Sequence, residues 1–214
     1  MKRLLLILIV SGFPCVIVAQ QPSYRFGIKG GINYIHLENY GKGFYTDFEA
    51  KPGWSAGILF QFSQGKFLNY SVVPELLLSE SRSEADMIYL TDYPANIRTL
   101  DIPVNFRLGL QLSRIFKPYL LGNIYGSMVI NNTGDFFSLL DIDNTSSETT
   151  MNKFFFGFSA GLGFELWKFQ VEGRYRWNMN KIRTDDFEAL KQMGMELSIA
   201  FMLPEIKLKS PEKP

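Results

Sequence analysis

The sequence predicts an all-β protein, an eight-stranded up-and-down antiparallel transmembrane β-barrel. Apolar side chains occupy every second position in eight separate segments, which is the period of a strand with one apolar face. The chain is 46% hydrophobic, yet after residue 20 no apolar run is long enough for a membrane helix. With 19 Phe, 10 Tyr and 3 Trp, the chain is too aromatic to be disordered.

Residues 1–20 have the layout of a secretory signal peptide. Lys2 and Arg3 precede an apolar stretch that is broken near its middle and turns polar after Ala19. We expect cleavage near residue 19 or 20, and an uncleaved anchor is the alternative. Cys15, the only cysteine, lies in this segment, so the mature chain is expected to lack disulfides, thiolate metal sites and cysteine nucleophiles.

The overall charge is balanced, with 22 basic and 21 acidic residues and a formal net charge of +1. A nucleic-acid-binding protein normally has a basic excess. Nucleic acid is therefore not expected as a partner.

Eight segments alternate between apolar and polar positions. In chain order they span 24–34, 54–63, 68–79, 99–110, 117–130, 154–166, 169–178 and 192–203. The fourth is the most regular, because one side is entirely apolar. The fifth is apolar on both sides, so the pattern does not orient it.

The connections between these segments alternate in length. Long loops are predicted at 38–52, 80–97, 131–152 and 179–189, and short turns at 64–66, 111–116 and 167–168. In an up-and-down sheet this order places the long loops at one rim and the short turns at the other, together with both termini. We expect the barrel to span residues 21–203 and a disordered periplasmic tail to span 204–214.

The composition of the two strand faces distinguishes a membrane barrel from a soluble one. One face holds most of the large apolar side chains, and the other holds Gly, Ser, Asn, Gln and charges. An eight-stranded barrel has a lumen just wide enough for side chains, and a neutral set of charges fits there because an unpaired buried charge is costly. Five basic and five acidic residues are predicted to form an ion-pair network in the lumen, namely Arg25, Lys29, Glu75, Asp101, Arg107, Glu165, Glu172, Arg174, Arg176 and Glu196.

Two other interpretations of these faces stay open. The charged network could line a gated pore or a proton path instead of closing the lumen. A soluble barrel would require the apolar faces to pack inward and the charges to face water.

Aromatic residues lie near the ends of the apolar faces, which is typical of the two aromatic girdles of a membrane barrel. The predicted girdle residues are Tyr24, Phe62, Tyr70 and Phe169 toward the short turns, and Tyr34, Trp54 and Trp177 toward the long loops. A signal peptide followed by a lipid-facing barrel indicates the bacterial outer membrane.

Four motifs resemble the PorT-like outer-membrane β-barrel family of Bacteroidetes. They are the stretch Phe26–Asn33, the Leu-Asp-Ile-Pro-Val run at 100–104, Lys117-Pro118-Tyr119, and the glycine-spaced strand at 157–163. The resemblance covers the mature chain and implies the barrel fold. Because the founding member is implicated in type IX protein secretion, it also implies an accessory role in such a system as an alternative function.

Candidate catalytic and metal sites are few. His36, the only histidine, could act in a small lipid-modifying enzyme if Ser55 or Ser79 approached it. The better interpretation is a solvated or girdle-level histidine.

Two acidic loop motifs are also better explained without a ligand. Asp141-Ile142-Asp143-Asn144 resembles part of a calcium loop but lacks the glycine and distal glutamate of that motif. Asp185-Asp186 is expected to be solvated. The glycines at 157, 161 and 163 are expected to admit large neighbouring side chains rather than to bind phosphate, because no helix pattern follows them.

The sequence therefore predicts a non-enzymatic integral outer-membrane barrel with a charge-plugged lumen. Four long loops would face the exterior for structural or binding roles. Expected partners are outer-membrane lipid and a protein or ligand at the loops, with no catalytic residue, cofactor or metal. The alternatives are an accessory barrel of a type IX-like protein secretion system and, less favoured, a small outer-membrane lipid-modifying enzyme.

Overall fold

The computed structural model describes residues 22–39, 47–87, 90–133, 153–180, 183–184 and 189–207. Their strands are β1 (Ser23–Asn39), β2 (Asp47–Gln64), β3 (Leu68–Met87), β4 (Leu90–Leu110), β5 (Phe116–Thr133), β6 (Phe154–Leu166), β7 (Phe169–Asn178), β8 (Arg183–Thr184), β9 (Ala189–Met202) and β10 (Ile206–Lys207). Within these ranges, no helix is long and apolar enough to cross a membrane.

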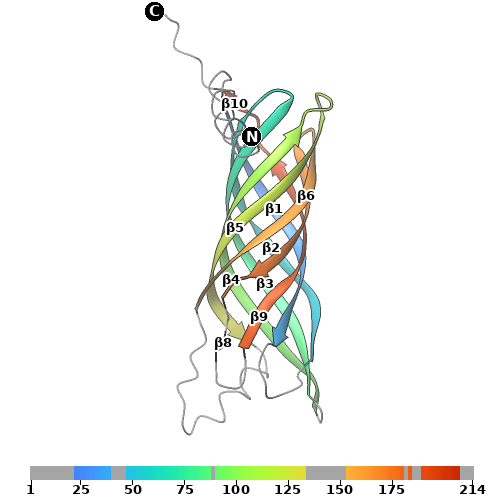
Figure 1. Cartoon of the computed structure of the whole chain (residues 1–214), viewed down its shortest axis with the longest axis vertical. Coiled ribbons are helices and arrows are strands. Elements are labelled where there is room, and N and C mark those ends of the chain that lie inside the picture. The colour runs from blue at the N-terminus through green and yellow to red at the C-terminus, as the bar shows by residue number, and fades with distance from the viewer. Residues whose placement is uncertain are drawn as a thin grey trace, which may run out of the picture.

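The eight long strands form one closed barrel (Figure 1). Strands β1 to β7 each pair antiparallel with the next, and β7 pairs with β9. The barrel closes between β1 and β9, whose register runs from Gly27 opposite Met202 to Asn39 opposite Leu190. The prediction of an eight-stranded up-and-down antiparallel barrel is confirmed.

Short turns join the strands at one end of the barrel, the end at which β1 begins and β10 lies (Figure 1). Two of these turns use left-handed backbone, at Gly65 with φ of 111° and at Trp167 with φ of 58°. Trp167 tolerates this strained conformation in a two-residue turn, where its N–H donates to the Ile115 carbonyl at 2.7 Å.

Alternation along the strands separates an apolar outer face from a polar interior. On β6, Phe156 and Leu162 are 54% and 66% exposed, whereas Ser159 between them is 2% exposed. The structure also orients the fifth segment, because Tyr119 and Asn123 on β5 face inward while Leu120 faces outward. That segment is apolar on both sides because tyrosines fill part of the lumen.

Two of the predicted long loops are largely strand, and this corrects the sequence prediction. The segment at 80–97 belongs to a hairpin in which β3 runs to Met87 and β4 starts at Leu90. The segment at 38–52 is strand except for 40–46, which lie outside the described residues. The physical reason is that charged side chains such as Lys51, Arg82 and Arg98 occupy the outer side of this extension, so the sequence there shows no apolar period.

The sheet also continues past Leu203, the predicted end of the barrel. Ile206 and Lys207 form β10 and pair with Tyr24 and Ser23 of β1. The rest of the predicted tail, 208–214, lies outside the described residues, as do the predicted signal peptide and most of the 131–152 loop.

Close backbone approach explains the glycine at position 57. A Cβ added to Gly57 would meet the Leu76 carbonyl oxygen, with the Leu76 carbonyl carbon and the Leu77 Cα each at 2.9 Å. These are backbone atoms of the adjacent strand β3, which cannot move cheaply. By contrast, a Cβ on Gly126 of β5 would meet nothing within 4 Å.

We therefore expect Gly57→Ala to lower the free energy of unfolding by about 1–3 kcal/mol, the usual effect of overpacking. Gly126→Ala is the matched control and should leave stability unchanged or slightly raised, because alanine restricts the unfolded chain. Urea unfolding of both variants in the same lipid vesicles measures the difference. Equal midpoints for the two variants would contradict the explanation.

Candidate functional site

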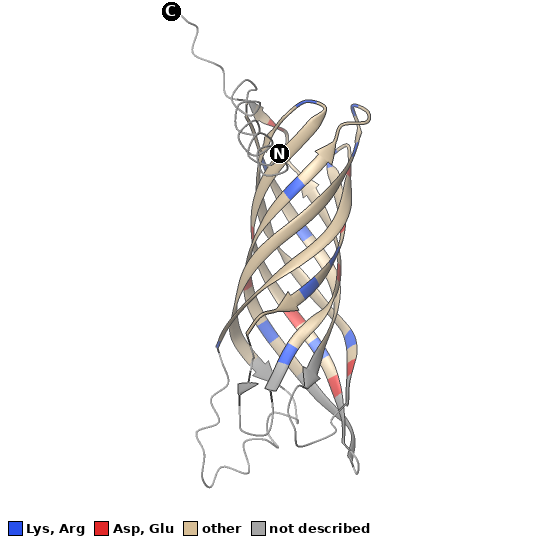
Figure 2. Cartoon of the chain, viewed as in Figure 1, with Lys and Arg blue, Asp and Glu red and all other residues tan. Residues whose placement is uncertain are grey.

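All ten charged residues named from the sequence lie on the inner face of the barrel. They come from β1, β3, β4, β6, β7 and β9, and ion pairs join them across the lumen. Figure 2 shows the charged positions along the strands. The most enclosed of them are Asp101, Glu172, Glu196, Glu75 and Lys29, each at most 4% exposed. The interior of this barrel is therefore a stack of charged and amide side chains.

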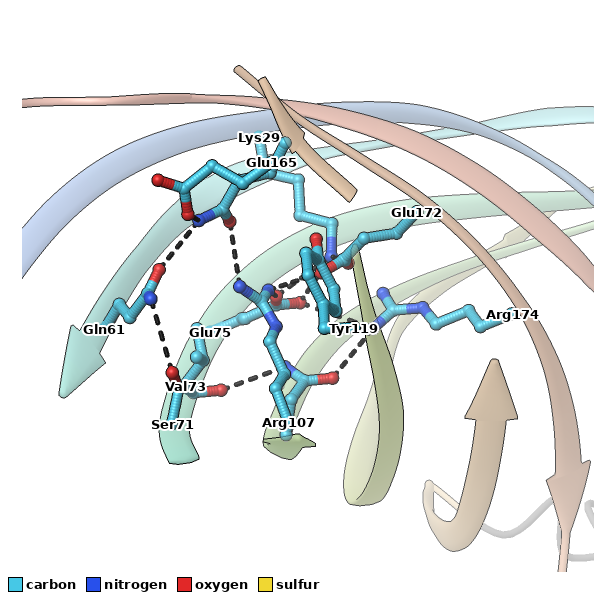
Figure 3. A network of polar contacts seen from close by, with 12 residues as sticks. Lys29, Gln61, Ser71, Val73, Glu75, Arg107, Tyr119, Glu165, Glu172 and Arg174 are labelled. Atoms are coloured by element: carbon cyan, nitrogen blue, oxygen red, sulfur yellow. Dashed lines mark hydrogen bonds and ion pairs between the residues drawn. The ribbon is translucent and has the colours of Figure 1, made fainter. Parts of the chain in front are cut away.

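Lys29 lies at the centre of this network, between two carboxylates (Figure 3). Its Nζ donates to Glu75 Oε1 at 2.9 Å and to Glu172 Oε2 at 2.6 Å. Arg107 contacts the same two carboxylates from β4, and Arg174 Nη1 lies 3.4 Å from Glu75 Oε2. Three cations thus surround two anions at this level.

A second set of ion pairs lies on the long-loop side of Lys29. Arg174 Nη2 donates to Glu196 Oε1 at 2.7 Å, and Arg176 Nη1 donates to Asp101 Oδ2 at 3.0 Å. Arg176 also lies 3.6 Å from Glu196, so the two pairs are joined. Arg174 links this set to the central one because it contacts both Glu75 and Glu196.

On the short-turn side, Glu165 is shared by two cations. Arg25 and Lys117 both contact its carboxylate, Lys117 at 3.2 Å. Gln170 Nε2 donates to Glu165 at 3.0 Å and to Gln61 at 2.8 Å, while its carbonyl accepts from Arg107 at 2.8 Å. An amide therefore connects this set to the centre.

Sequence reasoning missed several members of the network. Lys117, Tyr119 and Tyr125 are on β5, whose two-sided apolar pattern hid its facing. Tyr119 donates to Glu172 at 3.0 Å and packs under the Arg107 guanidinium, 5.1 Å from its ring centre. The Tyr125 ring likewise packs against the Arg176 guanidinium, whose central carbon lies 4.3 Å from the ring centre. These rings extend the network with cation–π contacts.

The interior leaves little free space between these groups. Two cavities within the network, one beside Asp101 and Arg176 and one beside Arg107 and Glu165, have volumes of about 10 Å³ each. A cavity of this size holds about one water molecule. The arrangement can exclude a hydrated ion, and it holds its charges in pairs.

The inner glycines of β6 admit the tyrosines of β5. A Cβ on Gly163 would lie 2.8 Å from the Tyr119 ring, and one on Gly157 would lie 2.7 Å from Tyr125 Cζ. This agrees with the sequence interpretation that these glycines make room for large side chains.

The seven predicted girdle residues lie on the outer face of the barrel. Tyr24 pairs with Phe62 across β1 and β2, and their ring centres are 5.4 Å apart. Trp177 stacks on Phe158 at 5.1 Å at the other end. The remaining girdle residues lie opposite apolar residues of the neighbouring strands: Tyr70 is opposite Leu108, Phe169 opposite Phe201, Tyr34 opposite Met195 and Trp54 opposite Ile32.

Beyond Trp54, the extension of β2, β3 and β4 carries charge on its outer side. Glu80 is opposite Trp54, and its side chain is 4% exposed between Arg82 and Arg98. Lys51 contacts Glu49 at 3.0 Å and Glu84 at 2.9 Å. This buried glutamate was not predicted, because it lies in a segment that was interpreted as loop.

His36 does not meet its two candidate partners. It follows the inward-facing Ile35 on β1 and so lies on the outer face. Ser55 and Ser79 face the lumen, where they donate to Glu196 at 3.4 Å and to Asp101 at 3.1 Å. The two proposed histidine–serine pairs are therefore wrong. The acidic motifs at 141–144 and 185–186 lie outside the described residues.

Solved structures of low sequence identity resemble this chain. Neisserial surface protein A is 11% identical, with 82% of this chain and 96% of that chain covered and a TM-score of 0.42. Ail, the attachment invasion locus protein of Yersinia pestis, is 8% identical, with coverages of 86% and 99% and a TM-score of 0.38. The outer membrane protein AlkL, determined in lipid bilayers, is 8% identical, with coverages of 91% and 93% and a TM-score of 0.37.

Among curated proteins, none matches the sequence. The sequence model of the outer membrane protein beta-barrel domain matches residues 5–201, which is nearly the whole chain. This protein therefore belongs to the outer membrane protein beta-barrel domain family.

Proposed function

We propose that this protein is a non-enzymatic barrel of the bacterial outer membrane, with a lumen closed by ion pairs and a long-loop end that binds a partner or ligand. The observation that carries the proposal is the network centred on Lys29, Glu75 and Glu172. Its cations and anions face one another through the lumen, and the two cavities found among these described residues are water-sized.

The energetics of the network favour a permanent plug over a gate. Glu75 contacts Lys29, Arg107 and Arg174, which come from three different strands. Opening a path would separate several of these contacts at once. Because an uncompensated buried charge costs several kcal/mol, such an opening is far less stable than the closed state.

The two aromatic levels support a membrane-spanning band of ordinary height. Tyr24 and Tyr34 are ten residues apart on β1, or about 33 Å along a strand. With the usual strand tilt this corresponds to about 25 Å across the membrane. We propose that residues 1–20 direct export, and that the short turns and both termini face the periplasm, as in other barrels with short periplasmic turns.

The long-loop end is then the surface for a partner. The extension of β2 to β4 projects past the apolar band and is held by the backbone pairing of β2 with β3 and of β3 with β4. Regular pairing makes this surface more rigid than a loop of the same length, which favours presentation to a partner. The two candidate serine partners of His36 lie on the opposite face of the sheet, so neither can form the pair that a catalytic histidine would need.

More narrowly, we propose that the chain belongs to the PorT-like group of this family. The motif at 100–104 supports this, because it resembles the recurrent apolar-acidic-Ile-Pro strand of that group. An accessory role in type IX secretion is the second candidate function and depends on that grouping.

Replacing Lys29 tests whether the network stabilises the barrel. Lys29→Met should lower the free energy of unfolding by about 3–5 kcal/mol, because it leaves two buried carboxylates short of a cation. Lys51→Met is the control and should have a much smaller effect, since its ion pairs are exposed to solvent. Urea unfolding followed by tryptophan fluorescence measures both. Similar losses in the two variants would refute the role of the network.

Single-tryptophan variants test the membrane band. Trp54 and Trp177 should be quenched by lipids brominated near the headgroup, because we place them at an interface. Trp167, 62% exposed in a short turn, should be quenched more strongly by aqueous acrylamide. If acrylamide quenches all three tryptophans equally, the placement is wrong.

Planar-bilayer recording tests the closed lumen. The wild-type barrel should show no current above background. A charge-neutral variant that carries Lys29→Ala, Glu75→Ala, Arg107→Ala and Glu172→Ala should conduct, because shortening these side chains opens a water-filled path without leaving unpaired charge.

The mobility of the unheated barrel in a denaturing gel serves as the folding control for this variant. Current steps through the wild-type protein would contradict the closed lumen. Lipid hydrolysis or acyl transfer by the wild type that is lost in His36→Ala would contradict the non-enzymatic assignment.

A further inference from the structure

A large open cavity lies at the short-turn end of the barrel, separate from the closed lumen. Its volume is about 890 Å³, within the range of ligand sites in proteins. Its walls are the three short turns, the start of β1 and the segment between β9 and β10. Its floor includes Gln61 and Glu165, which also belong to the network below.

Each of the three short turns places one basic residue on this cavity. Lys66 comes from the turn between β2 and β3, Arg114 from that between β4 and β5, and Lys168 from that between β6 and β7. Figure 2 shows the basic positions on the turns at this end. Arg25 and Lys117 add two cations deeper in the cavity.

Negative charge in the cavity does not balance these five cations. Among the described residues that line it, only Glu165 and Glu205 are acidic, and Glu165 is already shared by Arg25 and Lys117. Within the described part of the chain, no ion pair joins Lys66 or Arg114 to a carboxylate. The lumen cations, in contrast, each contact one. Positive potential is therefore concentrated at this mouth.

Backbone hydrogen bonds hold the rim in one shape. Gln111 N–H donates to the Phe67 carbonyl at 2.8 Å, and Trp167 N–H donates to the Ile115 carbonyl at 2.7 Å. Adjacent turns are thus linked to each other. A rim fixed before binding loses little entropy when a ligand enters.

We infer that this cavity is a binding site for a soluble anion that carries phosphate or carboxylate groups. The lysines and the arginine of the rim would contact the anionic oxygens. Lipid headgroups meet the outer face of the barrel, whereas this cavity opens inside the ring of turns. The inference goes beyond the proposed function and does not depend on closure of the lumen.

The test is calorimetric titration of the refolded full chain, in uncharged detergent, with inorganic pyrophosphate and with triglutamate. Both should bind at low salt and compete for one site. Binding should weaken strongly at about 1 M salt, where the Debye length is about 3 Å. The absence of binding at low salt would overturn the inference.

Two matched double variants identify the site. Lys66→Gln with Lys168→Gln should weaken pyrophosphate binding by about tenfold, equivalent to about 1.4 kcal/mol. Lys153→Gln with Lys191→Gln removes the same charge at the opposite end and should change affinity by less than about twofold. Equal losses in both variants would show a nonspecific effect of net charge and would overturn the inference.

A lipid comparison separates the two sources of anionic groups. In nanodiscs of zwitterionic phosphatidylcholine and of anionic phosphatidylglycerol, pyrophosphate should bind with similar affinity. If phosphatidylglycerol abolishes pyrophosphate binding, the occupant of the cavity is a lipid headgroup and the inference of a soluble ligand fails.

Discussion

Closure of β1 onto β9 is the constraint on which the rest of this structure depends. Inside a bilayer no water is available to backbone groups, so every strand needs a neighbour on both sides. Closure also fixes the register, and the register assigns each side chain to lipid or to lumen. A slip by one residue would exchange the two faces of a strand and place residues such as Lys29 or Glu75 in lipid. The apolar outer band and the polar interior both follow from that single pairing.

The strands were predictable from sequence only where their two faces meet different surroundings. Between the aromatic levels one face meets lipid and the other meets the lumen, so apolar residues alternate and the eight segments are plain. Past Trp54 charged side chains take the outer positions of β2, β3 and β4, and the period disappears although the strands continue. The buried Glu80 was missed for this reason. Backbone pairing of β2 with β3 and of β3 with β4 holds the extension, and it leaves no periodic signal in the side chains.

The members of the lumen network were largely predictable, whereas their partners were not. A charged residue that alternates with apolar residues along a strand is predicted, from its position alone, to face the lumen. Which residue it meets depends on stagger around the whole barrel, as with Glu75 on β3 and Arg174 on β7, 99 residues apart. Strand β5 shows a second limit of prediction from sequence. Tyr119 and Tyr125 are treated as apolar when the alternation of a strand is analysed, yet their hydroxyl groups and rings contact the charged residues of the lumen. The contribution of β5 to the network was therefore hidden.

The position of Lys29 has a consequence for how the chain enters a membrane. Lys29 lies on β1, but one of its carboxylate partners, Glu172, lies 143 residues later on β7. A partly inserted sheet made of the first hairpins would expose this ammonium, and soon Glu75 and Arg107, to lipid without the groups that later surround them. Insertion one hairpin at a time would therefore pass through states with unmatched charge in the bilayer. The lumen network makes assembly a collective event, in which the early strands cross the membrane together with the late ones.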